Sequence, residues 1–92
     1  MSLYTDRENG QRAEAILKNP VWAEAWEAYR QRILEEIERA PSSNTDTVMH
    51  LKRLLSACSA AKTHMERIMA EGSFAAKSIE LEEKQRKFKL FK

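Results

Sequence analysis

Residues 45–71 read TDTVMHLKRLLSACSAAKTHMERIMAE, and this stretch decides the fold. Its apolar residues recur at alternating steps of three and four positions, which is the spacing of one face of an α-helix. This row consists of Val48, Leu51, Leu55, Cys58, Met65 and Met69, and Lys62 is its one interruption. A second row, formed by Leu54, Ala61 and Ile68, lies beside it. Two rows make a face wider than a two-stranded coiled coil requires, so we expect this helix to contact more than one neighbour.

The stretch before it predicts another long helix, over residues 20–40. Asn19 can cap this helix, and Pro20 suits its first turn, where a missing N–H has no cost. Its large apolar residues follow one another at steps of three or four and form a single stripe. They are Trp22, Trp26, Tyr29, Ile33 and Ile37.

The segment between the two helices predicts a tight reversal of the chain. Pro41 ends the first helix, because the residue before a proline is driven out of the helical region. The linker over residues 41–44 is short and polar, so the second helix, predicted over residues 44–71, should return antiparallel. Ser43 and Asp46 have the spacing of a variant capping box.

The two ends of the chain predict shorter elements. A short helix is expected over residues 6–18, weakened by Gly10. Gly72 is expected to mark a helix end or a kink, and residues 73–92 a basic helical tail that projects away. The predicted fold is therefore all-α, an antiparallel helical hairpin of two long helices with a short N-terminal helix and a basic C-terminal tail, in a single domain over residues 1–92.

Composition limits the location and the class of protein. The chain has 92 residues, and Cys58 is its one cysteine, so an intramolecular disulfide cannot form. No apolar signal segment follows the N-terminus, and no run of about 20 apolar residues could span a bilayer. We therefore expect the cytoplasm or a particle assembled there, with no membrane contact. So short a chain has a thin core, which favours self-association.

Neither a catalytic centre nor a metal site is expected. His50 and His64 are 14 residues apart on one helix, which separates them by about 21 Å, and Cys58 lies between them. The glutamates lie on exposed helix faces, and no glycine-rich loop could hold a phosphate. We expect a protein that is not an enzyme and uses no cofactor.

Aromatic and apolar residues are the candidates for a protein interface. Trp22, Trp26 and Tyr29 either pack in the core or form an interaction hot spot, and in so thin a protein the two roles can coincide. Lys62 either extends its amine into water or sets the register by pairing with a glutamate. The full predicted interface is Trp22, Trp26, Tyr29, Leu51, Leu55, Met65, Phe88 and Phe91.

Charge is unevenly distributed along the chain. Residues 1–46 hold six Lys/Arg and nine Asp/Glu, for −3, whereas residues 47–92 hold ten and five, for +5. Such asymmetry suits head-to-tail pairing of chains or contact with an anionic partner. The last nine residues carry five cations and no acid, namely Lys84, Arg86, Lys87, Lys89 and Lys92. This tail is a solvated end, a segment that docks on a partner subunit, or a non-specific contact with nucleic acid or membrane.

Several short motifs resemble a known group of proteins. They are Ala13-Glu-Ala-Ile-Leu-Lys-Asn-Pro20, Glu24-Ala-Trp26, and Lys62-Thr-His64-Met-Glu followed by Gly72 and Ala75. Over about residues 12–80 the chain resembles small, largely uncharacterised tailed-phage and prophage proteins, whose genes lie among those for head and DNA-packaging proteins. The linker and the basic tail depart from that pattern. The resemblance implies a setting, phage particle assembly, but no chemistry.

Together these features predict a non-enzymatic protein that contacts other proteins in virion assembly or head and DNA packaging, as an oligomer. Its expected partners are further copies of itself and other phage structural or packaging proteins. One alternative is a DNA-associated accessory or regulatory protein that uses the basic tail. A further alternative is a helical hairpin subunit of a secretion system.

Overall fold

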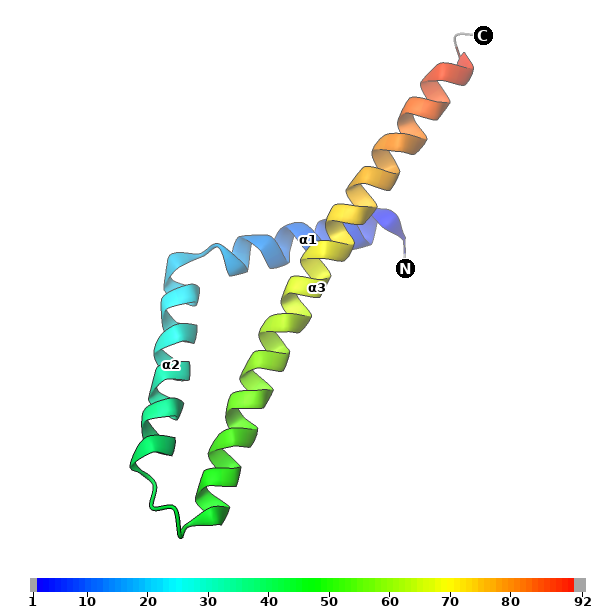
Figure 1. Ribbon diagram of the computed structural model, residues 1–92. Coiled ribbons are helices and arrows are strands. Elements are labelled where there is room, and N and C mark those ends of the chain that lie inside the picture. Colours follow the sequence, from blue (N-terminus) through cyan, green and yellow to red (C-terminus); the bar gives the residue numbers. More distant parts are fainter. Residues whose placement is uncertain (1, 91–92) are drawn as a thin grey trace. The chain divides into compact units, whose positions relative to one another are not determined.

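A computed structural model describes residues 2–90, and every regular element in that range is a helix (Figure 1). The elements are α1 (Leu3–Leu17), α2 (Pro20–Arg39) and α3 (Thr45–Leu90). The prediction of an all-helical chain is confirmed.

The boundaries of α2 follow from the residues that flank it. The side chain of Asn19 accepts a hydrogen bond from the backbone N–H of Val21 at 2.9 Å and so caps the first turn. Ala40, just after the last helical residue, has an extended backbone with φ −65° and ψ 133°. The ring of Pro41 imposes this conformation and ends the helix. Local chemistry is sufficient to define this element.

The other two helices begin differently from the prediction. Helix α1 starts at Leu3, because the hydroxyl of Ser2 accepts the N–H of Thr5 at 3.1 Å and adds a turn before residue 6. For α3, the prediction of Ser43 as the capping residue is wrong. The side chain of Asn44 accepts the N–H of Thr47 at 3.3 Å, so the cap lies one residue later.

Helix α3 continues through Gly72, which corrects the predicted division into a helix over 44–71 and a tail over 73–92. It has 46 residues, and none of the glycines in the described residues has a positive φ. A glycine inside a helix costs up to about 1 kcal/mol relative to alanine. Gly72 is nevertheless buried, because another helix lies directly against it. A tertiary contact thus overrides the local tendency of glycine to end a helix.

The chain is predicted as one helical domain, but its contacts divide it into two compact units. The hairpin unit is Leu17–His64, which contains α2 and the first part of α3. The crossing unit combines the chain up to Ile16 with α3 from Met65 onward. Each unit therefore has its own small core.

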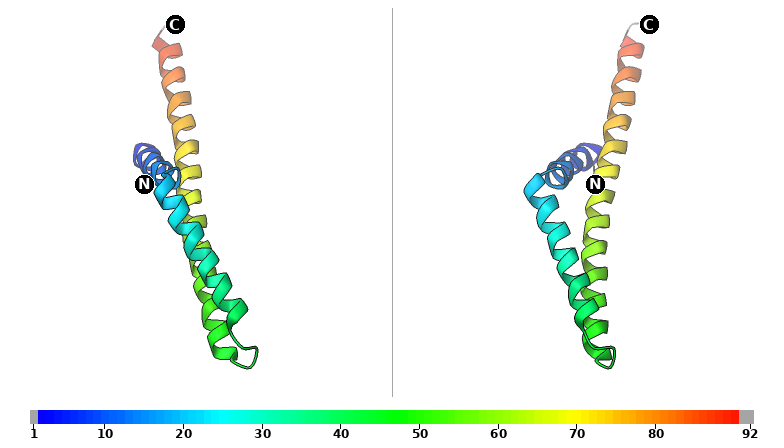
Figure 2. Two further views of the ribbon diagram at one scale, coloured as in Figure 1. Left: turned by 90° about the vertical axis from the view of Figure 1, so that its left-hand side faces the viewer. Right: turned by 60° about the vertical axis from the view of Figure 1, so that its left-hand side comes forward.

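In the hairpin unit, α2 and the first part of α3 run in opposite directions beside each other (Figures 1 and 2). Ile33 and Leu51 are its buried hydrophobic residues, with 3% and 7% of their surfaces exposed. Trp26, Ile37 and Leu55 are only half-buried. Two helices leave a thin core, so much of the apolar stripe on α2 retains contact with solvent.

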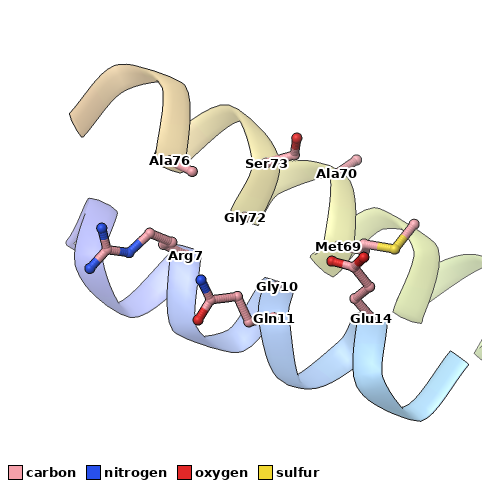
Figure 3. Close-up of a pocket in the computed structure, with 9 residues that line it drawn as sticks. All are labelled: Arg7, Gly10, Gln11, Glu14, Met69, Ala70, Gly72, Ser73 and Ala76. Carbon is pink, nitrogen blue, oxygen red and sulfur yellow. The ribbon is translucent and has the colours of Figure 1, made fainter. Parts of the chain in front are cut away.

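In the crossing unit, α1 meets α3 at two glycines (Figure 3). A Cβ atom placed on Gly72 would lie 2.5 Å from the Cα atom of Gly10, so the two backbones are in direct contact. Ala13, Ala75 and Ile79 are the buried hydrophobic residues here. The predicted basic tail over residues 73–92 therefore begins with two turns that are packed in the crossing unit, where Ala75 and Ile79 are buried.

Candidate protein-interaction site

One side of α2 carries three aromatic residues, Trp22, Trp26 and Tyr29, which we call the aromatic face. The rings of Trp22 and Trp26 are stacked, with centroids 5.7 Å apart and planes inclined by 21°. Their spacing of four residues places them one above the other on a helix. Trp22 has 39% of its surface exposed and Tyr29 has 46%, while Trp26 is half-buried. The stack is therefore held within the hairpin unit and also open to a partner.

A small hollow of about 100 Å³ lies beside this stack. The end of α1, the start of α2 and one residue of α3 line it, through Leu17, Trp22, Ala23, Trp26, Glu27 and Lys62. Lys62 is exposed, so the residue that interrupts the apolar row of α3 places one cation at the edge of the aromatic face. Glu27 supplies a carboxylate at the same hollow. The site thus combines apolar area with both signs of charge.

The predicted interface residues do not form one surface. Leu51 is a core residue of the hairpin unit, and Leu55 is half-buried in the same unit. Met65 is half-buried in the crossing unit, where Phe88 has 68% of its surface exposed. Phe91 lies outside the described residues. The structure brings together Trp22 and Trp26, with Tyr29 farther along the same helix.

The basic residues predicted for nucleic acid occupy the last turns of α3. Lys84, Arg86, Lys87 and Lys89 are all exposed, and Lys92 lies outside the described residues. Lys84 also pairs with Glu80 one turn earlier, at 3.3 Å between Nζ and Oε1. An exposed pair of this kind contributes little stability. These cations therefore remain accessible to an anionic partner.

Two features were absent from the predicted sites. The first is the contact of Gly10 with Gly72, beside which lies an open hollow of about 490 Å³ (Figure 3). Polar side chains from α1 and small ones from α3 line this hollow, chiefly Arg7, Gln11, Glu14, Ala70, Ser73 and Ala76. The second is an exposed apolar line on α3, in which Phe74 and Leu81 join the predicted Phe88. A seven-residue spacing in the sequence was the available signal for that line.

Among residues 2–90, no cluster of three or more His, Cys, Asp or Glu side chains is positioned to hold a metal ion. Within the same range, no helix combines the length and the apolar character needed to cross a membrane. Comparison with protein-family models, curated proteins and solved structures finds no match to this chain.

Proposed function

We propose that this chain is a non-enzymatic helical protein that contacts other proteins through the aromatic face. The stacked pair of Trp22 and Trp26, held by the hairpin unit and still partly exposed, is the observation that carries the proposal. Tryptophan and tyrosine are concentrated at the centres of protein interfaces, because they offer large rigid area together with one polar group.

The exposed area is sufficient to anchor a partner. Trp22 and Tyr29 expose 39% and 46% of their surfaces. An aromatic side chain buries about 150–250 Å² when fully enclosed, so these two residues offer on the order of 200 Å². That area suits the centre of an interface and is smaller than a complete interface. Glu27 and Lys62 at the adjacent hollow would form part of the polar rim around it.

The biological setting belongs to the same proposal. The resemblance to small tailed-phage proteins supports a role in virion assembly or head and DNA packaging, as an oligomer with other structural or packaging proteins as partners. In that setting the chain would act in the host cytoplasm or in the virion. The hairpin supplies a rigid support for the aromatic face, and no chemical step is required.

The test uses tagged full-length chain recovered from cells that produce the particles. A bound protein, identified by mass spectrometry, should be lost with the double variant Trp22→Ala/Trp26→Ala. Tyr4→Ala is the matched control, because Tyr4 is an aromatic residue of α1 with 54% of its surface exposed. Retention of the partner by the double variant, with helical content unchanged by circular dichroism, would contradict the proposal.

A second candidate function is association with DNA through the last turns of α3. The observation in its favour is the exposure of Lys84, Arg86, Lys87 and Lys89 with no acid after Glu83. Four phosphate contacts predict that the binding constant falls with salt, with a log–log slope of about −3.6. Binding to duplex DNA at about 50 mM salt should be lost when residues 84–92 are deleted. Absence of binding at low salt would eliminate this candidate.

A further inference from the structure

Residues 80–89 of α3 read ELEEKQRKFK, and this segment complements its own reverse. Aligned with a second copy running the other way, the acidic first half of each segment meets the basic second half of the other, and Leu81 meets Phe88. The reversal has its centre between Lys84 and Gln85. Every residue from Glu80 to Lys89 is exposed in the single chain.

The same helix carries the exposed apolar line, which two copies could bury between them. Phe74, Leu81 and Phe88 are seven residues apart and expose 70%, 60% and 68% of their surfaces. At about 100° of rotation per residue, they lie roughly opposite Ala75 and Ile79. Ala75 and Ile79 are 1% and 2% exposed, and they belong to the crossing unit, which also contains most of α1. A helix covered by α1 on one side therefore presents a second apolar side that α1 does not reach.

We propose that two copies of the chain associate through this line, antiparallel, about a two-fold axis between Lys84 and Gln85. Leu81 of each copy packs against Phe88 of the other. This inference rests on the oligomeric part of the proposed function, to which it assigns a surface, and it does not involve the aromatic face.

Charge complementarity identifies a second copy as the occupant. In an antiparallel pair of helices, a residue on one flank of the contact faces residues on the same flank of the other helix. Glu80 and Lys87 share one flank of the apolar line, while Glu82 and Lys89 share the other, where they line a common shallow hollow. Glu80 therefore faces Lys87 of the second copy, and Glu82 faces Lys89. Symmetry repeats both pairs, which gives four ion pairs around two apolar contacts.

A parallel orientation of the two helices lacks this charge complementarity. In a parallel pair in register, Glu80 would lie near Glu82 of the other copy, and Lys87 near Lys89, so that like charges meet. The antiparallel pair has one unfavourable feature, because Lys84 lies close to the axis and near its own symmetry mate. Its pair with Glu80 of the same chain, at 3.3 Å, draws the ammonium along its own helix. Replacing Lys84 with glutamine removes the repulsion between the two copies of this side chain, so we expect that variant to associate more strongly.

The contact is short, which determines the expected affinity. The overlap of residues 80–89 covers just under three helical turns, or about 15 Å. An interface of that length lies well below the size of stable dimers, so we expect a dissociation constant of roughly 100 µM. Exposed ion pairs are screened by salt, and raising NaCl from about 50 to about 500 mM should weaken association several-fold.

A charge-swap experiment on the full chain tests the pairing. One variant is Glu80→Lys/Glu82→Lys and the other is Lys87→Glu/Lys89→Glu. By sedimentation equilibrium, each alone should associate at least about tenfold more weakly than the original chain, and an equal mixture should recover the original affinity. The control is Glu83→Lys, which reverses a charge on the side of the helix away from the apolar line and should leave association unchanged.

Spin labels distinguish the two orientations. In a Cys58→Ala background, a label at position 85 lies beside the axis, and a label at position 73 lies far from it. In the antiparallel pair the two labels at 85 should be near each other, while those at 73 should be about 35 Å apart along the axis. Short distances at both positions would indicate a parallel pair and overturn the proposal.

Several other results would overturn the proposed dimer surface. If either charge variant associates as well as the original chain, or if the mixture does not associate, this surface is not the one used. The proposed function could then still stand through another surface. A chain that stays monomeric at about 1 mM would overturn both this inference and the oligomeric claim. Binding of DNA by the segment without self-association would also overturn it.

Discussion

Replacing Gly72 with alanine tests whether α1 and α3 touch through their backbones. In an exposed helix this substitution should stabilise, because alanine is favoured over glycine by about 1 kcal/mol. At Gly72 the new methyl group would lie 2.5 Å from the Cα atom of Gly10 and 2.8 Å from the carbonyl oxygen of Asp6. Neither neighbour is a flexible side chain that could turn aside. The helices themselves must move apart.

The size of that movement sets the cost. Ordinary contact begins at 3.4 Å, so the Cβ atom falls about 0.9 Å short of the required separation from Gly10. Inserting a methyl group into a close-packed contact costs about 1–3 kcal/mol. After subtraction of the gain in helix propensity, we expect Gly72→Ala to destabilise the crossing unit by about 1–2 kcal/mol. The sign is opposite to that for an uncontacted helical glycine.

Thermal unfolding followed by circular dichroism measures the effect. For a chain of this size, about 1 kcal/mol corresponds to a change in Tm of about 4–8 °C. Ser73→Ala is the matched control, because Ser73 is exposed in the same turn and should change stability by only a few tenths of a kcal/mol. Amide exchange should show that protection is lost in α1 and retained in α2. A rise in Tm for Gly72→Ala would refute the close contact.

Three further predictions concern the hairpin unit. Asn19→Ala should reduce stability by about 1 kcal/mol in urea denaturation, while Asn19→Gly should cost only a few tenths, because the cap accepts the first N–H groups of α2. Ile33→Ala should cost about 2–4 kcal/mol, whereas Val21→Ala should stay within about 0.5 kcal/mol, since these residues are 3% and 74% exposed. Trp22→Phe should remove the coupled circular-dichroism signal of the stacked indoles, with helix content maintained; an unchanged signal would exclude the stack with Trp26.

The helices of the hairpin unit could be predicted because local signals determine them. The alternating steps of three and four place Leu51 on an inward face, where it is buried. Asn19 and Pro41 bound α2 through side-chain chemistry that acts within a few residues. The cap of α3 was misplaced by one residue because Ser43 and Asn44 are both good capping residues, and spacing alone does not choose between them.

Gly72 shows why the remainder could not be predicted in the same way. From its neighbours in the sequence, Gly72 predicts the end of a helix. In the structure it lies inside a helix and contacts Gly10, 62 positions earlier in the chain. A contact between residues so far apart leaves no periodic signal in either segment. The burial of Ala75 and Ile79 follows from that contact, so the packing of α3 after Gly72 was missed together with it. The aromatic face was identified because its three residues lie on one helix.

The lengths of the two helices in the crossing unit connect the glycine contact to self-association. Helix α1 has 15 residues and is about 22 Å long, whereas α3 from Met65 to Leu90 is about 39 Å long. Among residues 65–89 of α3, the last buried residue is Ile79, one turn before the exposed Glu83. A helix that extends past its support must tolerate water on all sides or acquire another neighbour. In residues 80–89 the charged side chains favour contact with water, whereas Leu81 and Phe88 favour contact with another apolar surface. Their reversed complementarity makes a second copy of the same helix the neighbour that satisfies both.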